Sequence, residues 1–134
     1  MTGITALLLF IGWTLLLALS YAGVRVPPIL LGKKSANHWE RGEPVDDPAI
    51  LVRAKGAHLN CLENLPLFAA LVLIGVVTNQ SAVVDSVAGV FIYARFGQSI
   101  VHLIGTSLPL ILLRATLFIV QVAIMLYLTV SMLS

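Results

Sequence analysis

Four long apolar segments follow one another along the chain, with shorter polar segments between them. A helix that crosses a lipid bilayer needs about 20 mainly apolar residues. Four segments meet this length: residues 4–24, 48–77, 82–104 and 109–132. The pattern therefore predicts an all-α integral membrane protein, a four-helix bundle that forms a single domain over residues 1–134.

Prolines and short polar turns indicate where these helices begin and end. Pro27-Pro28 predicts the end of the first helix, because proline donates no backbone hydrogen bond. Asp47-Pro48 predicts the start of the second, with Asp47 as the N-cap and Pro48 at the first helical position. The connections before the third and fourth helices are short, so the last three helices should be antiparallel neighbours. The first connection, residues 25–47, is a long loop.

The composition supports membrane insertion. Hydrophobic residues make up 59% of the chain and charged residues 10%, with a mean hydropathy of +1.01, whereas soluble domains carry about 25% charged residues. Residues 1–24 contain no charged side chain, so we expect a retained first span and no cleavable signal peptide. The single cysteine excludes an internal disulfide. No spacing typical of a metal site is present.

Basic residues predict the orientation of the bundle. The first loop and its flanks contain Arg25, Lys33, Lys34, Arg41, Arg53 and Lys55. The connection between the second and third helices contains no Lys or Arg. Since basic loops stay in the cytoplasm, we expect loop 25–47 to be cytoplasmic. The basic residues lie beside membrane segments, so we expect them to contact lipid headgroups and not nucleic acid. From the brevity of the chain we expect a bacterial inner membrane.

Ionisable side chains interrupt three of the predicted spans. Glu63, Arg95 and Arg114 each lie in an otherwise apolar helix. A charged group in hydrocarbon costs several kcal/mol, so it persists where it meets a partner or a cavity. Helical spacing places further polar residues beside these three. On the second helix the stripe is Arg53, Ala57, Asn60 and Asn64, on the third Arg95, Gln98, Ser99, His102 and Thr106, and on the fourth Arg114, Phe118, Gln121 and Met125.

The depth of these residues predicts one shared polar cavity. Arg114 lies about 7 Å inside the fourth helix and Arg95 about 14 Å from the end of the third, both from the cytoplasmic side. Two guanidinium groups suit a carboxylate, because they form paired hydrogen bonds with it. Glu63 suits an ammonium, so a zwitterion is the expected ligand. The alternative is structural, with Glu63 neutralising Arg95 and Arg53 reaching the headgroups.

The segment Arg53–Pro66 resembles the signature of the MAPEG family, the membrane-associated proteins in eicosanoid and glutathione metabolism. Ala57, Asn60, Glu63 and Pro66 match that signature in place. The helix-three and helix-four arginines, the four spans and the long first loop also agree, so the resemblance covers nearly the whole chain.

The resemblance implies a homotrimer that holds glutathione, as co-substrate, in a cleft between neighbouring subunits. Arg114 would lie near the glutathione thiol and favour its thiolate, the competent nucleophile. The residues expected to bind glutathione are Arg53, Asn60, Glu63, Arg95 and Gln98, with His102 where the family often has tyrosine.

The function expected from this resemblance is a membrane-bound glutathione transferase or peroxidase. Its other substrate would be a lipophilic small molecule that arrives through the membrane lipids. Ala115 and Phe118 follow Arg114 where catalytic members frequently have serine and tyrosine. One alternative is therefore a non-catalytic member that binds lipid or serves as a scaffold. A small transporter is a further alternative, although the chain has neither a broken helix nor an internal repeat.

Overall fold

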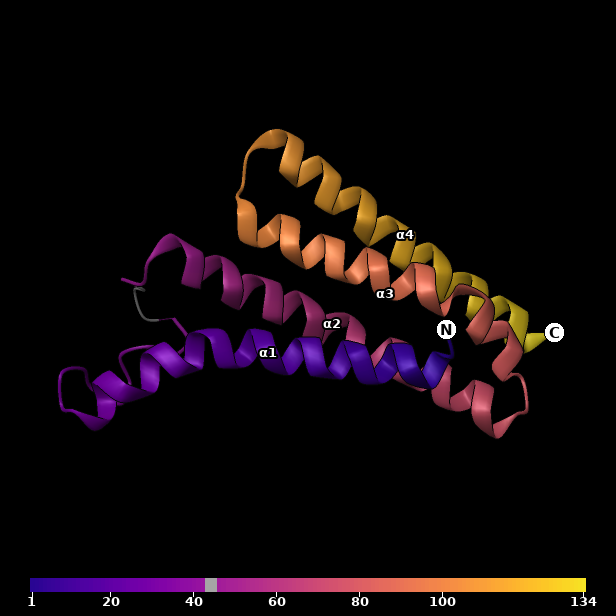
Figure 1. The fold of residues 1–134 in the computed structure, drawn as a ribbon, viewed down its shortest axis with the longest axis horizontal. Helices are drawn as coiled ribbons and strands as arrows, with labels where there is room; N and C mark the ends of the chain where they lie inside the picture. Colours follow the sequence, from indigo (N-terminus) through magenta and orange to yellow (C-terminus); the bar gives the residue numbers. More distant parts are fainter. Residues whose placement is uncertain (43–45) are drawn as a thin grey trace.

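The computed structural model describes residues 1–42 and 46–134, which form four long helices (Figure 1). These are α1 (Gly3–Leu30), α2 (Ala49–Val77), α3 (Ser81–Ile104) and α4 (Leu108–Leu133). Each is long and apolar enough to cross a membrane. The predicted all-α membrane bundle is thereby confirmed, whereas positions 43–45 of the predicted loop lie outside the described residues.

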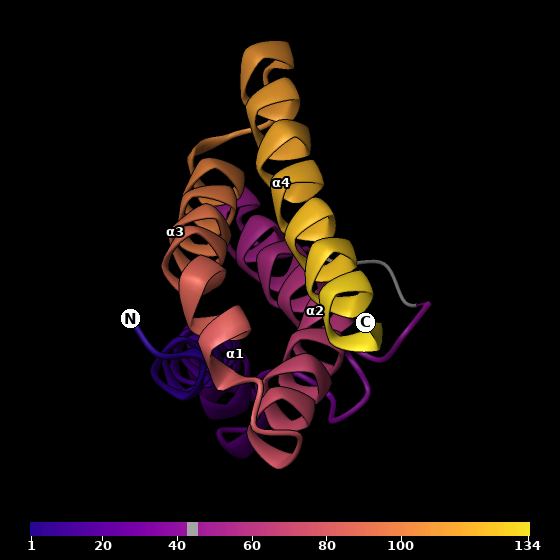
Figure 2. The same ribbon diagram turned by 90° about the vertical axis from the view of Figure 1, so that its right-hand side faces the viewer.

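The four helices do not contact one another equally. α1 packs against α2 and α3, and α3 also packs against α2 and α4. α4 lies mainly on α3, contacts α2 less, and does not reach α1 within the described residues. Figures 1 and 2 show the result: α4 diverges from α1 and α2 toward its first residue, so the bundle opens at the end that carries the α3–α4 connection.

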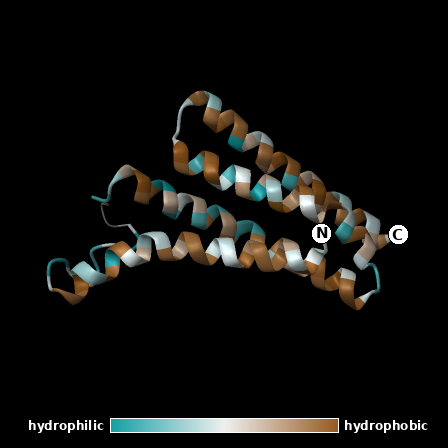
Figure 3. Cartoon of the chain, viewed as in Figure 1, coloured by the Kyte–Doolittle hydropathy of each residue, from teal (hydrophilic) through white to brown (hydrophobic). Residues whose placement is uncertain are grey.

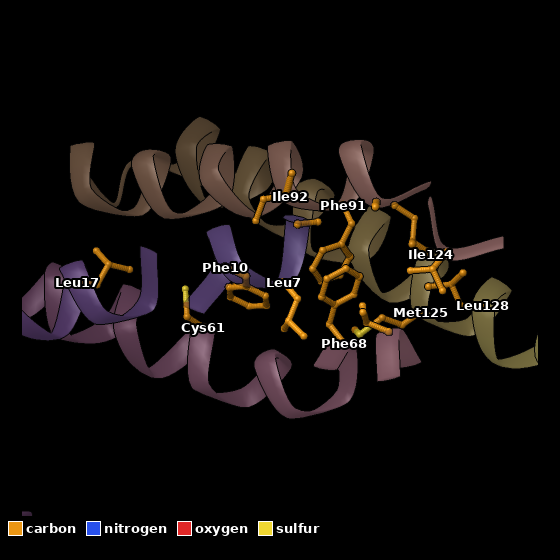
Figure 4. Packing of buried hydrophobic residues seen from close by; sticks show 14 of the residues in the cluster. Leu7, Phe10, Leu17, Cys61, Phe68, Phe91, Ile92, Ile124, Met125 and Leu128 are labelled. Atoms are coloured by element: carbon orange, nitrogen blue, oxygen red, sulfur yellow. The ribbon is translucent and has the colours of Figure 1, made fainter. Parts of the chain in front are cut away.

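Aromatic side chains form the centre of the core (Figure 4). Phe68 of α2 stacks on Phe91 of α3 with ring centroids 3.8 Å apart, and Phe10 of α1 packs against both. All three rings are fully buried. The buried residues of α4 all lie in its second half, at Gln121, Ile124, Met125 and Leu128. The first half of α4 therefore contributes no buried residue to the core, and Val120 at its end is only partly buried there.

Hydrophobic residues predominate along all four helices (Figure 3). Large hydrophobic side chains are exposed along each of them, including Leu8, Leu67, Val90 and Leu126. Hydrophilic residues gather in the connection between α1 and α2. Such a distribution suits a protein whose surroundings are lipid along the helices and water at their ends.

The predicted end of the first helix was wrong, because α1 continues through Pro27 and Pro28 to Leu30. Each proline removes one backbone donor but keeps its carbonyl acceptor. Leu31 N–H donates to the Pro27 carbonyl (3.0 Å) and Lys33 N–H to the Pro28 carbonyl (2.8 Å). These hydrogen bonds let one further turn form after the prolines, just as a proline is tolerated in the first turn of a helix.

The predicted capping role of Asp47 was also wrong. The N-cap residue of α2 is Pro48, and no side chain among the described residues caps this helix end. The Asp47 carboxylate instead accepts hydrogen bonds from Arg25 (3.1 and 2.5 Å) and from the Trp39 indole (2.9 Å). A largely buried guanidinium attracts a carboxylate more strongly than a helix N-terminus does, so Asp47 links the end of α1 to the start of α2.

A second carboxylate in the loop is held by two basic side chains. Asp46 accepts hydrogen bonds from Lys34 Nζ (2.9 Å) and His38 Nε2 (2.8 Å). The hydrogen bonds from Lys34 and then His38 lower the pKa of Asp46 to about 2. This loop is consequently tied together by hydrogen bonds over the residues that the structure describes.

At the opposite end of the bundle, Asp85 of α3 accepts a hydrogen bond from the Gly3 backbone N–H (2.6 Å). Gly3 is the first residue of α1, whose unpaired N–H groups favour a negative charge. The contact fixes the start of α1 against α3, and through it the height of Phe10 in the core.

Candidate functional site

A hollow of about 220 Å³ lies between α2, α3 and α4, in the part of the bundle where α4 diverges. Its lining combines polar and apolar side chains, namely Asn60 and Glu63 of α2, Gln98 of α3, and Ile111, Arg114, Ala115 and Phe118 of α4. Four residues predicted for the site, Asn60, Glu63, Gln98 and Arg114, thus share one hollow. Three separate helices contribute to this arrangement.

The amide of Asn60 is oriented by a buried arginine behind it. Arg95 Nη1 donates to Asn60 Oδ1 over 2.6 Å. Because the carbonyl oxygen of the Asn60 side chain is engaged there, its amide N–H groups remain as hydrogen-bond donors for a ligand. Asn60 therefore has both amide N–H donors available to the hollow that it lines, while one lone pair of its oxygen is used by Arg95.

The same logic applies to Gln98 on α3. Gln121 Nε2 of α4 donates to Gln98 Oε1 over 2.9 Å, and also to the Leu117 carbonyl over 2.9 Å. Gln121 is fully buried and Gln98 is 3% exposed. With one lone pair of its oxygen engaged, Gln98 keeps its amide N–H groups as donors for a ligand. The two amides are thus both fixed from behind.

The charged residues of the hollow remain available for a ligand. Among residues 1–42 and 46–134, neither Glu63 nor Arg114 forms an ion pair within 4.0 Å. The alternative in which Glu63 neutralises Arg95 is likewise not seen in this part of the chain. The hollow accordingly offers donors from two amides and one guanidinium, and a single carboxylate as acceptor.

Arg95 lies behind the hollow and does not line it. The side chain is fully buried, and its guanidinium lies over the Phe10 ring, 5.1 Å from the centroid. Within residues 1–42 and 46–134, its Nε and Nη2 atoms have no hydrogen-bond partner. The structure therefore places Arg95 against Asn60 and α1, one layer away from the position of a ligand in the hollow.

Arg53 and His102 also lie outside the hollow, at the contact between α2 and α3. Arg53 Nε donates to the Leu103 carbonyl over 2.9 Å. The His102 ring lies against Gly56, where an added Cβ would be 3.0 Å from His102 Cε1. Gly56 thus leaves the space that the imidazole occupies. Both side chains thus connect α2 to α3 near the end of the bundle that carries the α3–α4 connection.

The predicted stripe on the second helix is divided by the structure. Asn60 lines the hollow, but Ala57 and Asn64 are buried, the former within the core cluster. Asn64 Nδ2 donates to the Asn60 backbone carbonyl over 3.3 Å. Cys61, the next residue after Asn60, is also fully buried. The division arises because α2 turns the face of Ala57 and Cys61 toward the core.

Sequence reasoning did not identify the apolar wall of the hollow. Ile111 and Ala115 join Phe118 there, on the same face of α4 as Arg114. Their spacing of three or four residues from one another is a helical stripe. Extending the Arg114 stripe by one turn in the N-terminal direction would have found Ile111.

Comparison with known proteins gives one positive result. The family model described as MAPEG family matches residues 3–134. No curated protein matches the chain, and no solved structure matches it. The match covers all four helices and every residue of the hollow. The chain belongs to the MAPEG family.

Proposed function

We propose that this protein is a membrane-bound glutathione transferase or peroxidase that acts on lipophilic electrophiles. The observation that carries the proposal is the meeting of Asn60, Glu63, Gln98 and Arg114 in one hollow. Membership of the MAPEG family supports it.

The polar groups of the hollow complement glutathione, a peptide with two carboxylates, one ammonium and one thiol. Asn60 and Gln98 supply N–H donors, which suit a carboxylate. Glu63 is the acceptor that suits the ammonium. Both amides are held from behind, so they need little reorganisation when the ligand binds. A site with more donors than acceptors matches a ligand with more carboxylate than ammonium.

Arg114 is the residue that we assign to the thiol. A fixed guanidinium favours the thiolate, which is the reactive form of the group. In the transferase reaction the thiolate sulfur forms a bond to an electrophilic carbon, and the leaving group departs with the electron pair. In the peroxidase reaction the sulfur attacks the outer hydroperoxide oxygen, the O–O bond breaks, and the alkoxide takes a proton to become an alcohol. A second glutathione then reduces the sulfenic acid, giving glutathione disulfide and water.

The apolar wall supports a lipophilic second substrate. Ile111, Ala115 and Phe118 lie beside Arg114, and all three are exposed. A molecule dissolved in the bilayer would meet this wall without crossing water. Arg114, which we assign to the thiol, thus lies next to the apolar wall, which we assign to the lipophilic substrate.

The size of the hollow supports a homotrimer as the active form. Its volume of about 220 Å³ is below the range of roughly 300–1,000 Å³ that is usual for ligand pockets. Glu63 is also exposed in a single subunit, although it lies within a helix that crosses the membrane. A neighbouring subunit on this side would enlarge the pocket and remove the carboxylate from lipid. We further propose that the α1–α2 connection faces the cytoplasm, in a bacterial inner membrane.

The test is glutathione binding to the purified protein in detergent, with ultraviolet absorbance reporting the thiolate. We expect binding and a thiolate signal in the native protein, and loss of that signal in Arg114→Ala. The matched control is Arg41→Ala, which removes an exposed arginine of the loop and should change neither quantity. Turnover of a chromogenic electrophile by the native protein completes the test, and absence of glutathione binding would refute the proposal.

The non-catalytic alternative rests on the side chains around Arg114. Ala115 and Phe118 provide no hydroxyl that could donate a proton to a leaving group. If glutathione binds but no thiolate forms and no electrophile is consumed, the protein is a ligand-binding member and the enzymatic proposal is wrong. A small transporter would instead show glutathione flux in liposomes.

A further inference from the structure

A second cavity lies between the end of α1 and the α1–α2 connection, away from the hollow. Its volume is about 560 Å³, more than twice that of the hollow. Arg25, which lines it, lies about 33 Å along α1 from Gly3, roughly the thickness of the hydrocarbon core. Tyr21 and Trp39 also line it, and such aromatics favour the membrane–water boundary. The cavity is therefore at the level of the lipid headgroups.

The floor of this cavity continues an exposed apolar stripe on α1. Ala22, Val26 and Ile29 line the cavity, and Leu15 and Leu19 precede them at the same helical spacing. Leu15 is 58%, Leu19 65% and Val26 49% exposed. The stripe runs from the middle of the predicted span into the cavity. An acyl chain lying on it would bring its headgroup to the cavity.

Two groups of opposite charge face this headgroup position. Arg25 is 8% exposed, and its guanidinium is held over the rings of Tyr21 (5.1 Å) and Trp39 (5.5 Å). Arg25 donates to Asp47 through Nε and Nη2, which leaves Nη1 as a donor. Glu40 is exposed on the cavity rim and forms no ion pair with the described residues. One cationic donor and one anionic acceptor suit a zwitterion.

We propose that this cavity binds the headgroup of a bilayer phospholipid that carries a phosphate and a primary ammonium. The phosphate lies at Arg25, the ammonium at Glu40, and one acyl chain on the stripe from Leu15 to Ile29. A primary ammonium donates hydrogen bonds to a carboxylate, whereas a trimethylated one cannot. Arg25 also holds Asp47 just before α2, so the lipid would contact the link between the first two helices. The site is independent of the glutathione proposal.

The experiment is native mass spectrometry of the delipidated full-length protein in detergent, titrated with defined lipids. Phosphatidylethanolamine is the probe, and phosphatidylcholine and phosphatidylglycerol of the same chain length are the comparisons. We expect retention of phosphatidylethanolamine with an affinity about tenfold above that of phosphatidylcholine, from one charge-assisted hydrogen bond. Glu40→Gln should remove this preference.

A matched pair of substitutions tests the location without altering any charge. Val26→Trp fills the cavity floor, while Val24→Trp adds the same side chain nearby on α1, outside the cavity. The two positions are similarly exposed, at 49% and 51%. Only Val26→Trp should abolish lipid retention, with helical circular dichroism unchanged in both variants.

Four results would overturn the proposal. The first is equal affinity for the three lipids, which would indicate an apolar surface without headgroup recognition. The second is preference for phosphatidylglycerol, which would indicate an anion site alone. The third is lipid retention in Val26→Trp, which would place the lipid away from the cavity. The fourth is crosslinking of position 26 to a second copy of the chain, since the stripe would then be covered by protein.

Discussion

Replacing Asn60 by alanine tests whether the pair with Arg95 supports the hollow. Arg95 is fully buried, and its hydrogen bond to Asn60 Oδ1 spans 2.6 Å. Hydrogen bonds to charged groups contribute about 1.5–3 kcal/mol. Those between membrane helices average about 0.6 and reach about 1.7 kcal/mol. Because this bond is charged and its arginine is fully buried, although Asn60 is only half-buried, Asn60→Ala should lower the free energy of unfolding by about 2 kcal/mol.

The assay is denaturation by sodium dodecyl sulfate in mixed micelles, followed by circular dichroism at a fixed ratio of protein to detergent. The control is Asn64→Ala, one turn further on α2, which removes a 5% exposed asparagine that donates only to a backbone carbonyl. We expect this control to cost less than about 1 kcal/mol. Arg95→Ala completes a double-mutant cycle, with a coupling energy of about 1–2 kcal/mol. Equal losses in the two asparagine variants, or additive effects in the cycle, would refute the reasoning.

Three further predictions use the same preparations. Gly75→Ala should destabilise the protein by about 1 kcal/mol, because its Cβ would lie 2.7 Å from Val84 Cγ2 and overpacking exceeds the gain in helix propensity. The control is Gly12→Ala, whose Cβ meets no atom of the described residues within 4 Å and which should stabilise the protein by up to about 1 kcal/mol. Equal shifts of the two denaturation curves would contradict the close contact between position 75 and Val84. Gln121→Leu removes the hydrogen bond that orients the Gln98 amide. It should raise the glutathione Kd, measured by calorimetry, about threefold to tenfold. An unchanged Kd would exclude the Gln98 amide from glutathione binding. Asp46, with its pKa lowered to about 2, should support loop order above about pH 4 and lose this effect as the pH falls through its folded-state pKa. The pepsin cleavage rates of the native protein and Asp46→Asn should therefore converge toward pH 2, and a constant ratio would contradict this.

The sequence was sufficient to predict the fold because a segment that crosses lipid must satisfy its backbone N–H and C=O groups by hydrogen bonds within the protein. Each apolar segment had to be a helix, so hydropathy alone located all four. The helix ends were less predictable because side chains distant in sequence determine them. Aspartate is a residue type that is preferred at N-caps, yet the Asp47 carboxylate accepts hydrogen bonds from Arg25 and Trp39. A capping rule that considers only the neighbouring residues cannot predict that interaction.

The sequence predicted which face of its helix each candidate site residue occupies, but not whether the residue lines the hollow or lies behind it. Arg95 and Gln98 share a face by spacing, and both were expected to contact the ligand. In the structure Gln98 lines the hollow, whereas Arg95 lies over Phe10 of α1. Spacing of three residues rotates a side chain by about 60°, and which neighbour it then meets depends on how the helices pack. The position of Phe10 beside Arg95 has no counterpart in the local sequence pattern.

The divergence of α4 has a consequence for how this protein could acquire new chemistry. The buried residues of its second half anchor the helix in the core, while Ile111, Arg114, Ala115 and Phe118 lie in the half that has no buried residue. Substitutions at Ile111, Ala115 and Phe118 would change the shape of the hollow beside Arg114 at little cost to the free energy of folding. If the proposed function holds, the residues that determine substrate range and those that stabilise the fold lie on separate segments of α4, so selection can change the first while conserving the second.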